Sequence, residues 1–368
     1  MPGDSRDVRH LRRQTGLALL MLLVTAASDG SAADKSPLDR RPQPWKRRDK
    51  PVLSARTTKQ AWCRIVCYSP HVIQHDGRFR MWYLGTSRSS RSNDIAMGYA
   101  ESLDGIRWTE HPGNPVLSGD DIPWGRIVQT PFVVFDAPTK RYRMWFVSGA
   151  GVTRDKSKKV FTVNDQKLGY ATSPDGKEWT VHPRPLFPSG RSPCVIRTAA
   201  NRYRMWMGSS PQQDVVSSGL YSNIFEFSST DGLDWTRSAQ PVLKPDGPAR
   251  STVYPFVIRH RDAWYMWYGC HVDGGRFELF CAKSTDGTRW SVDHQRPAFP
   301  ARKGKTAFDS RYTSTPSLVR SKDRLLLYYS SRDWVTEFID SKGKKRRDGA
   351  GIYAHIGVAE LTLPGSLD

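Results

Sequence analysis

A repeat of about 61 residues constrains the fold of this 368-residue chain more than any other feature. A short aromatic element occurs five times, and its central aromatic residue advances by 63, 61, 61 and 61 positions. A proline lies upstream of each copy, with spacings of 61, 62, 62 and 61 residues. The copies are Arg80-Met81-Trp82-Tyr83, Arg143-Met144-Trp145-Phe146, Arg204-Met205-Trp206-Met207, Tyr265-Met266-Trp267-Tyr268 and Leu326-Leu327-Tyr328-Tyr329, and the prolines are Pro70, Pro131, Pro193, Pro255 and Pro316. Such regular spacing excludes coincidence and predicts five structural units.

Each unit contains the pattern of four short strands. An apolar stretch follows the proline, the Met-Trp element comes next, and an alternating run of small and apolar residues forms the third strand. A Ser-x-Asp-Gly-x-x-Trp element follows, and Asp-Gly favours a tight hairpin turn because both central residues must tolerate positive φ. Copies of this element begin at Ser102, Ser173, Ser229 and Ser284. Four strands repeated at this spacing are typical of a β-propeller blade.

The two ends of the chain predict how the ring closes. The fifth unit ends near Leu361 without an Asp-Gly turn or a fourth-strand tryptophan. Trp45 lies six residues before Pro51, and the equivalent step in other units is six or seven residues. We therefore predict an all-β fold, a single five-bladed β-propeller of four-stranded blades over residues 45–364. Residues 45–50 complete the last blade, which removes an open edge.

The segment before the propeller has the pattern of an export signal. Four arginines precede the apolar run from Gly16 to Ala27, which is too short for a membrane span of about 20 residues. The small residues Ser31-Ala32-Ala33 follow it, as at a cleavage site. We predict a secretory signal peptide over residues 1–33, a linker over 34–44, a secreted or periplasmic location and no membrane insertion. The pair Arg12-Arg13 suggests twin-arginine export.

The composition indicates a folded, basic protein. Lysine and arginine number 56 and aspartate and glutamate 36, so the formal charge is 56 − 36 = +20. With 38% hydrophobic residues the chain can bury a core, which excludes wholesale disorder. Five cysteines are too few and too scattered for a disulfide-stapled scaffold, and they predict no particular pairing. We expect a monomer without a cofactor or metal.

Basic residues gather in the loops of one face. Arginines lie close to the start of every first strand, two to six residues before the prolines: Arg64, Arg126, Arg191, Arg250 and Arg311. Further basic residues lie in the loops between second and third strands, namely Arg88 and Arg91, then Arg154, Lys156, Lys158 and Lys159, then Lys342, Lys344, Lys345, Arg346 and Arg347. Arginines around a central funnel would suit carboxylate, sulfate or phosphate groups. Arginines that bridge neighbouring blades are the structural alternative.

The repeated elements resemble those of the arabinanase, levansucrase and invertase superfamily of five-bladed glycoside hydrolases. The resemblance covers nearly the whole predicted propeller. It implies carbohydrate chemistry at the central funnel, with catalytic carboxylates just before the inner-strand prolines. This chain departs from that pattern, because the five residues before the prolines are not acidic: Ser69, Thr130, Ser192, Tyr254 and Thr315.

Hydrolysis of a glycosidic bond normally needs two carboxyl groups, so other acidic residues on the same face become candidates. Glu226 lies between Phe225 and Phe227, where desolvation would suit a general acid. Asp94, Asp273 and Asp333 are candidates for the base or nucleophile. Further substrate-binding candidates are Arg332, Tyr254 and His271, although His271 also fits an ordinary loop position.

Two functions of different classes follow from these residues. The first is a secreted glycoside hydrolase acting on an acidic or sulfated polysaccharide through two carboxylates in the funnel. The second is a non-catalytic propeller that binds anionic glycans through the same arginines. A sialidase-like hydrolase is a further alternative, which the number of blades disfavours. Nucleic acid is disfavoured as a partner because no single element interleaves aromatic and basic residues.

Overall fold

The computed structural model describes residues 36–88, 94–149, 151–155, 160–164, 166–209, 223–247, 251–340, 342–348 and 351–363. The predicted signal peptide lies outside this part of the chain. The helical elements described are four short 3-10 turns: η1 (Pro37–Asp39), η2 (Ala61–Cys63), η3 (Gly119–Asp121) and η4 (Asp273–Gly275). None of them is long and apolar enough to cross a membrane.

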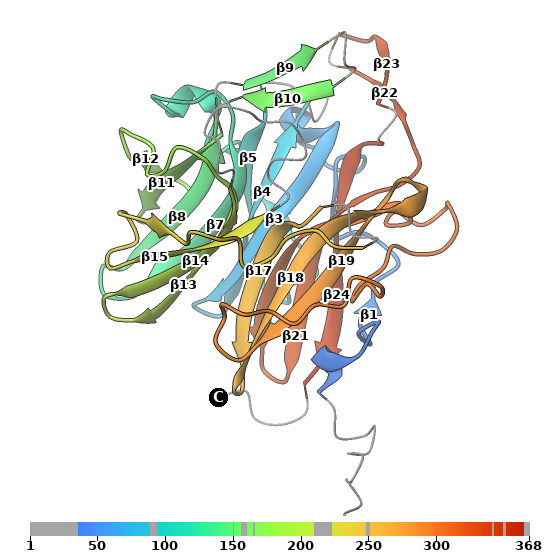
Figure 1. Cartoon of the computed structure of the whole chain (residues 1–368). Coiled ribbons are helices and arrows are strands. Elements are labelled where there is room, and N and C mark those ends of the chain that lie inside the picture. Colours follow the sequence, from blue (N-terminus) through green and yellow to red (C-terminus); the bar gives the residue numbers. More distant parts are fainter. Residues whose placement is uncertain are drawn as a thin grey trace, which may run out of the picture. The chain divides into compact units, whose positions relative to one another are not determined.

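Antiparallel four-stranded sheets form the first three blades, as predicted (Figure 1). The first contains β3 (Val66–His75), β4 (Arg78–Thr86), β5 (Ala96–Ser102) and β6 (Thr109–Glu110). The second contains β7 (Gln129–Asp136), β8 (Arg141–Ser148), β11 (Lys167–Ser173) and β12 (Thr180–Val181). The third contains β13 (Arg191–Ala199), β14 (Arg202–Gly208), β15 (Ile224–Ser229) and β16 (Thr236–Arg237).

The last two blades are joined by one parallel residue pair, Phe277 with Tyr312. The fourth blade contains β17 (Val253–His260), β18 (Ala263–Val272) and β19 (Arg276–Ser284), and isolated bridges at Ser291 and Phe299 take the place of a fourth strand. The fifth contains β20 (Tyr312–Ser321), β21 (Arg324–Arg332) and β24 (Tyr353–Thr362). The N-terminal strands β1 (Lys46–Arg47) and β2 (Leu53–Ser54) both pair with β24, so the predicted closure is confirmed.

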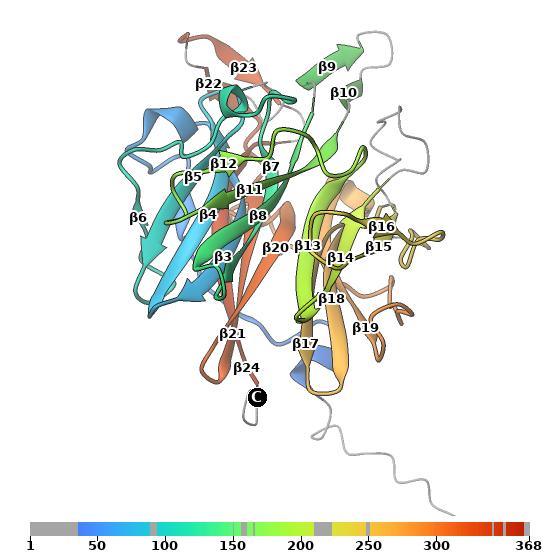
Figure 2. The same ribbon diagram turned by 90° about the vertical axis from the view of Figure 1, so that its left-hand side faces the viewer.

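The five inner strands surround one axis (Figure 2). Each inner strand contacts the next one around the axis. The contacts are β3 with β7, β7 with β13, β13 with β17, β17 with β20, and β20 with β3, so the ring is complete. The Met-Trp tryptophans lie in the core with no exposed surface: Trp82, Trp145, Trp206 and Trp267. The chain is therefore a single five-bladed β-propeller, as the repeat predicted.

A hydrogen bond from each Met-Trp strand to the following unit explains why the two repeated motifs occur together. In three blades the indole N–H donates to the carbonyl of the Asp-Gly glycine in the next blade, at 2.7–3.0 Å. The donor and acceptor pairs are Trp82 with Gly176, Trp145 with Gly232, and Trp206 with Gly287. In the fifth blade the Tyr328 hydroxyl takes the place of the indole and donates to the Gly105 carbonyl at 2.7 Å.

The fourth blade uses the N-terminal segment for the same purpose. Because the fifth blade has no Asp-Gly turn, the indole of Trp267 donates to Oε1 of Gln43 instead, at 3.0 Å. Leu38 is fully buried in the core, and the Gln43 N–H donates to the Ala298 carbonyl. Residues 36–44 are thus packed against the propeller, which differs from the linker expected over 34–44.

Two hairpins extend beyond the blades at the same end, as Figures 1 and 2 both show. One joins β8 to β11 and contains β9 (Gly151–Asp155) and β10 (Val160–Asn164). The other joins β21 to β24 and contains β22 (Glu337–Ile339) and β23 (Lys345–Arg347). Both are the loops between second and third strands in which the sequence concentrates basic residues.

Candidate functional site

Each inner strand has a β-bulge at its proline. The strand register shifts there in all five blades, and the residue before the proline has a positive φ. These residues are Ser69 (51°), Thr130 (43°), Ser192 (57°), Tyr254 (58°) and Thr315 (45°). Positive φ is unusual for residues other than glycine and costs energy. Its repetition in every blade therefore makes the axis a candidate for the functional site. A bulge redirects a side chain, and here all five side chains carry a hydroxyl group.

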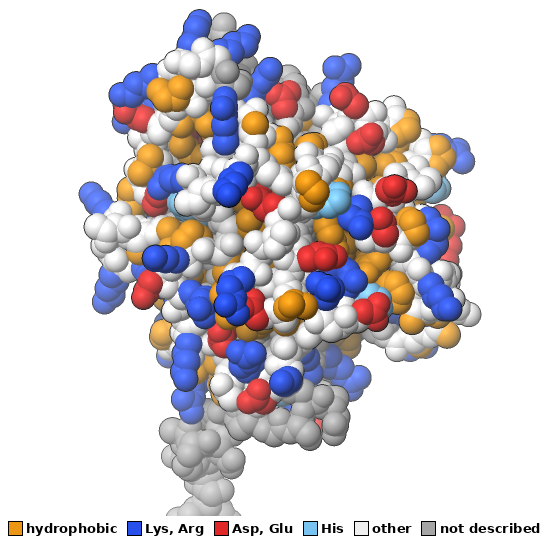
Figure 3. All heavy atoms as spheres, turned by 180° about the vertical axis from the view of Figure 1, so that it is seen from behind, with side chains coloured by type: hydrophobic (Ala, Val, Ile, Leu, Met, Phe, Trp, Pro, Cys, Tyr) orange, Lys and Arg blue, Asp and Glu red, His pale blue; other side chains and the backbone are white. Residues whose placement is uncertain are grey.

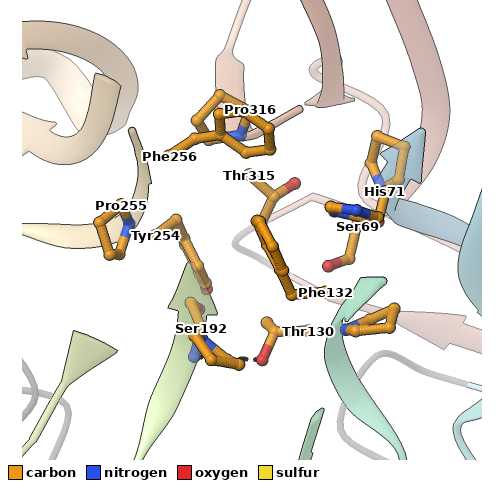
Figure 4. A pocket seen from close by; sticks show the side chains of 13 residues that line it. Ser69, His71, Thr130, Phe132, Ser192, Tyr254, Pro255, Phe256, Thr315 and Pro316 are labelled. Carbon is orange, nitrogen blue, oxygen red and sulfur yellow. Dashed lines mark hydrogen bonds between the residues drawn. The ribbon is translucent and has the colours of Figure 1, made fainter. Parts of the chain in front are cut away.

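These side chains line a small pocket on the axis (Figure 4). Its volume is about 30 Å³, enough for about two water molecules and too small for a sugar ring. Below the hydroxyl groups the ring of His71 packs against that of Phe132, with 4.4 Å between the ring centres. The ring of Phe132 packs against that of Phe256, with 5.8 Å between the centres. No acidic residue is among the thirteen described residues that line it. A carbohydrate would therefore have to bind above this pocket, at its mouth.

The hydroxyl groups of Thr130, Thr315 and Tyr254 form hydrogen bonds with other groups of the protein. Oγ1 of Thr130 accepts a hydrogen bond from the N–H of Ser192 at 3.1 Å (Figure 4). Oγ of Ser330 accepts from the N–H of Ser69 at 2.6 Å and also contacts Oγ1 of Thr315. Oγ of Ser192 is buried and has no hydrogen-bond partner among the described residues.

Arg191 and Tyr254 form one side of the mouth. Arg191 is the first residue of β13, and its Nη2 donates to the Tyr254 hydroxyl at 2.7 Å. The guanidinium carbon lies 5.2 Å from the centre of the Tyr254 ring. Arg191 is half-buried, and the described part of the chain provides it with this phenol but with no carboxylate in an ion pair. An arginine with that surrounding suits a carboxylate from outside the protein.

Arg332 forms a second cationic group at the mouth. Its guanidinium lies 3.6 Å above the centre of the Tyr353 ring and 4.8 Å from that of Tyr312. Tyr353 in turn stacks on Tyr68 at 5.1 Å with a 13° angle between the rings. Nη1 of Arg332 donates to the Gly351 carbonyl at 3.1 Å. The phenol rings thus hold the guanidinium by cation–π contacts and by packing.

His271 lies beside both arginines. Its ring contacts Phe277 at 4.7 Å, and its Nδ1 lies 3.0 Å from Oγ of Ser251. Desolvation, together with the positive charges of Arg191 and Arg332, lowers the pKa of His271 to about 4. His271 is therefore neutral near pH 7, and the positive charge at the mouth belongs to the arginines.

Comparison with proteins of known structure covers nearly the whole chain. A glycoside hydrolase of the GH130 family, which targets β-1,2 mannosidic linkages in Candida mannan, is 16% identical, with 88% of this chain and 96% of that chain covered and a TM-score of 0.61. A glycosyl hydrolase from Bacteroides ovatus gives the same figures. The catalytic domain of a GH62 α-L-arabinofuranosidase from Coprinopsis cinerea is 14% identical, with 88% and 97% covered and a TM-score of 0.59. The chain has the fold of the five-bladed β-propeller glycoside hydrolases.

Sequence comparison covers a smaller part of the chain than structural comparison. No family model matches the chain. Two uncharacterized proteins of Mycobacterium tuberculosis are 28% identical over 99 residues and 30% identical over 151 residues. These matches span 27% and 38% of this chain, and 32% and 44% of the two relatives.

Within this glycoside hydrolase fold, Glu226 does not lie at the mouth. It lies on β15, the third strand from the axis, and Oε1 accepts a hydrogen bond from Arg204 Nε at 2.6 Å. Oε2 accepts from Thr288 in the next blade at 2.9 Å. Both oxygens are bound by the protein in a contact between blades. This placement does not fit the predicted role of Glu226 as a general acid in the funnel, because strand register directs its side chain toward the neighbouring blade.

Asp333 is also bound by the protein. It follows β21 directly and lies 2.6 Å from Nη1 of Arg56 and 3.4 Å from Nε2 of His355. Burial alone would raise the pKa of Asp333, but hydrogen bonds from His355 and Arg56 outweigh it and hold the pKa well below its usual range. Because Ser54 on β2 contacts Nδ1 of His355 at 2.9 Å, this network fastens the N-terminal segment to the fifth blade.

Asp94 and Arg126 lie together in a second pocket, on the first blade. Its volume is about 300 Å³, and Trp62 and Asp120 also line it. Asp94 forms an ion pair with Arg88 at 2.7 Å. None of the residues lining this pocket lines the axial one, so Asp94 and Arg126 share a pocket of their own on the first blade.

The remaining predicted site residues lie in different parts of the structure. Asp273 is exposed in η4, two residues after His271. Arg64 is exposed at the end of η2, and Arg311 lies 4.8 Å from the Trp334 ring, beside the mouth. Arg250 lies outside the described residues.

The mouth also contains three aromatic residues that the sequence pattern does not single out: Tyr68, Tyr312 and Tyr353. Tyr68 and Tyr312 lie two and four residues before their prolines, so no shared offset in the repeat marks them.

Proposed function

We propose that this protein binds an anionic carbohydrate at the mouth of the propeller, with Arg191 and Arg332 contacting the acidic group. The observation that carries the proposal is the position of Arg191, half-buried at the axis with a phenol as its partner. Carbohydrate as the ligand class is supported by the structural neighbours, which are described as hydrolases of mannosides and arabinofuranosides. Export through residues 1–33 would bring the protein to extracellular polymers, and this too is part of the proposal.

The tyrosine rings make the site suited to a sugar acid rather than to a free inorganic anion. Tyr353 and Tyr254 position the two guanidinium groups, and the axial pocket beneath them offers hydroxyl groups. A planar guanidinium binds a carboxylate through two parallel hydrogen bonds, which a lysine at the same position cannot form.

Substitution of Arg191 tests this function. We expect Arg191→Gln to weaken binding of galacturonic acid by about 10- to 100-fold, because a charge-assisted hydrogen bond contributes about 1.5–3 kcal/mol. Arg191→Lys should recover only part of the affinity. Isothermal titration calorimetry measures the effect, with Arg289→Gln, an exposed arginine paired with Asp286, as the matched control. Equal binding of galacturonic acid and galactose by the unaltered protein would contradict the proposal.

Hydrolysis of the bound carbohydrate is a second candidate function, and the fold shared with glycoside hydrolases favours it. Asp273, close to the mouth, and Asp94, which shares a pocket with Asp120, are the predicted carboxylates that remain exposed. If either acts in the reaction, Asp273→Asn or Asp94→Asn should lower product release from an acidic polysaccharide at least 100-fold without loss of binding. Mass spectrometry of the products provides the measurement. Binding without any product would leave recognition alone as the function.

A further inference from the structure

We propose that the mouth is the first of several anion-binding positions, and that the ligand is therefore a polyanionic chain such as a polyuronate rather than a single acidic sugar. The positions continue from Arg332 along β22 and β23. This inference rests on the proposed function, since it extends the same site.

A continuous series of contacts connects the mouth to Lys305, in the segment before β20. Arg332 and Arg311 both lie against the Tyr312 ring, at 4.8 and 5.9 Å. Arg311 also lies 4.8 Å from the centre of the Trp334 ring, and Lys305 lies 5.6 Å from it. Three cations thus follow one another, separated by aromatic rings that keep them apart and hold them in place.

The hairpin formed by β22 and β23 continues this series. It begins at Glu337, three residues after Trp334, and all of its basic residues are exposed. Lys345 and Arg346 form ion pairs with Glu337 and Asp340, both at 2.7 Å. For Lys342, Lys344 and Arg347 the described part of the chain contains no such pair. Figure 3 shows lysine and arginine side chains at the end of the molecule that carries this hairpin, and others spread over the rest of that face.

The contacts of these groups with aromatic rings favour a chain of acidic sugars over nucleic acid. Proteins that bind single-stranded nucleic acid stack bases on open aromatic faces. Here guanidinium or ammonium groups already occupy a face of Tyr353 and of Trp334. What the series offers to a ligand is therefore charge at successive positions, which suits a polymer with one carboxylate per sugar unit.

Binding of galacturonate oligomers of increasing length tests the inference. We expect the affinity to rise at least tenfold from the monomer to an oligomer of about six units, and this gain to shrink between 50 and about 200 mM salt because neutralised charges release counterions. In the double variant Lys344→Ala/Arg347→Ala the gain should fall at least threefold, while monomer binding stays unchanged. The pair Arg107→Ala/Arg289→Ala, which removes two exposed arginines of the Asp-Gly turns, serves as the control.

Each outcome of this experiment leads to a different conclusion. If the monomer binds and the oligomer binds no more tightly, the polyanion inference is wrong and the proposed function stands. If neither binds, the proposed function is wrong as well. If an oligonucleotide of equal charge binds as tightly as the oligogalacturonate, the surface is a nucleic-acid site instead. A loss of length dependence in the control variant would show an effect of net charge rather than of the hairpin.

Discussion

At the scale of single residues, the axis combines unusual backbone geometry with uncharged polar side chains. The five residues before the prolines adopt positive φ, and each places a hydroxyl group near the axis. The sequence shows that none of the five is acidic. It does not predict their positive φ, because φ at these positions depends on the bulge and no local sequence pattern indicates the bulge. Beneath them lies His71, buried between Phe132 and Phe256, with its Nε2 donating to the Val133 carbonyl at 2.8 Å.

His71 makes the stability of the fold depend on pH. Burial lowers its pKa from 6.5 to about 4, so between these values the unfolded chain binds a proton that the folded chain does not. The stabilisation is complete above pH 6.5 and is lost as the pH falls toward 4, by about 3 kcal/mol for this residue. We expect His71→Gln to flatten the dependence of the unfolding free energy on pH between 4.5 and 6.5. Urea titrations at several pH values measure the slope, and an unchanged slope would contradict this assignment.

At the scale of structural elements, the bond from each Met-Trp strand to the following unit links motifs that the sequence presents as separate repeats. The same scale explains why part of the site was not predicted. The contact between Arg191 and Tyr254 joins the first strands of two blades, so it appears in no single unit. The apolar neighbours of Glu226 predict a place in the funnel, yet its position on β15 opposite Trp206 directs it toward the next blade.

Gln43 provides the sharpest test of the bonds between blades. It accepts hydrogen bonds from the indoles of Trp45 at 2.9 Å and Trp267 at 3.0 Å. Gln43→Ala would leave the fully buried indole of Trp267 without its acceptor, and we expect a loss of about 3 kcal/mol in the free energy of unfolding. Urea denaturation measures it. The exposed Gln240→Ala should change stability by less than about 0.5 kcal/mol, and a similarly small change for Gln43→Ala would refute the role given to this residue.

At the scale of the whole molecule, the fold was largely predictable and the site only in part. Spacings of 61–63 residues recur because every blade must meet its neighbours through the same contacts, so the number of blades and the closing strand could be derived from the sequence. The site has no such repetition. The mouth draws on β3, β13, β17, β18, β20, β21 and β24, and its composition follows from which side chains this single arrangement brings together.

The closing strand has a consequence for how the protein is made. Lys46 pairs with Glu360, which the ribosome adds 360 − 46 = 314 residues later. During synthesis β1 therefore has no partner until β24 has been made. By then the first four blades precede β24 on the nascent chain, and a strand of the last blade has an unpaired edge. An unpaired strand edge is a template for another chain, so the nascent protein is most exposed to association just before its final strand leaves the ribosome.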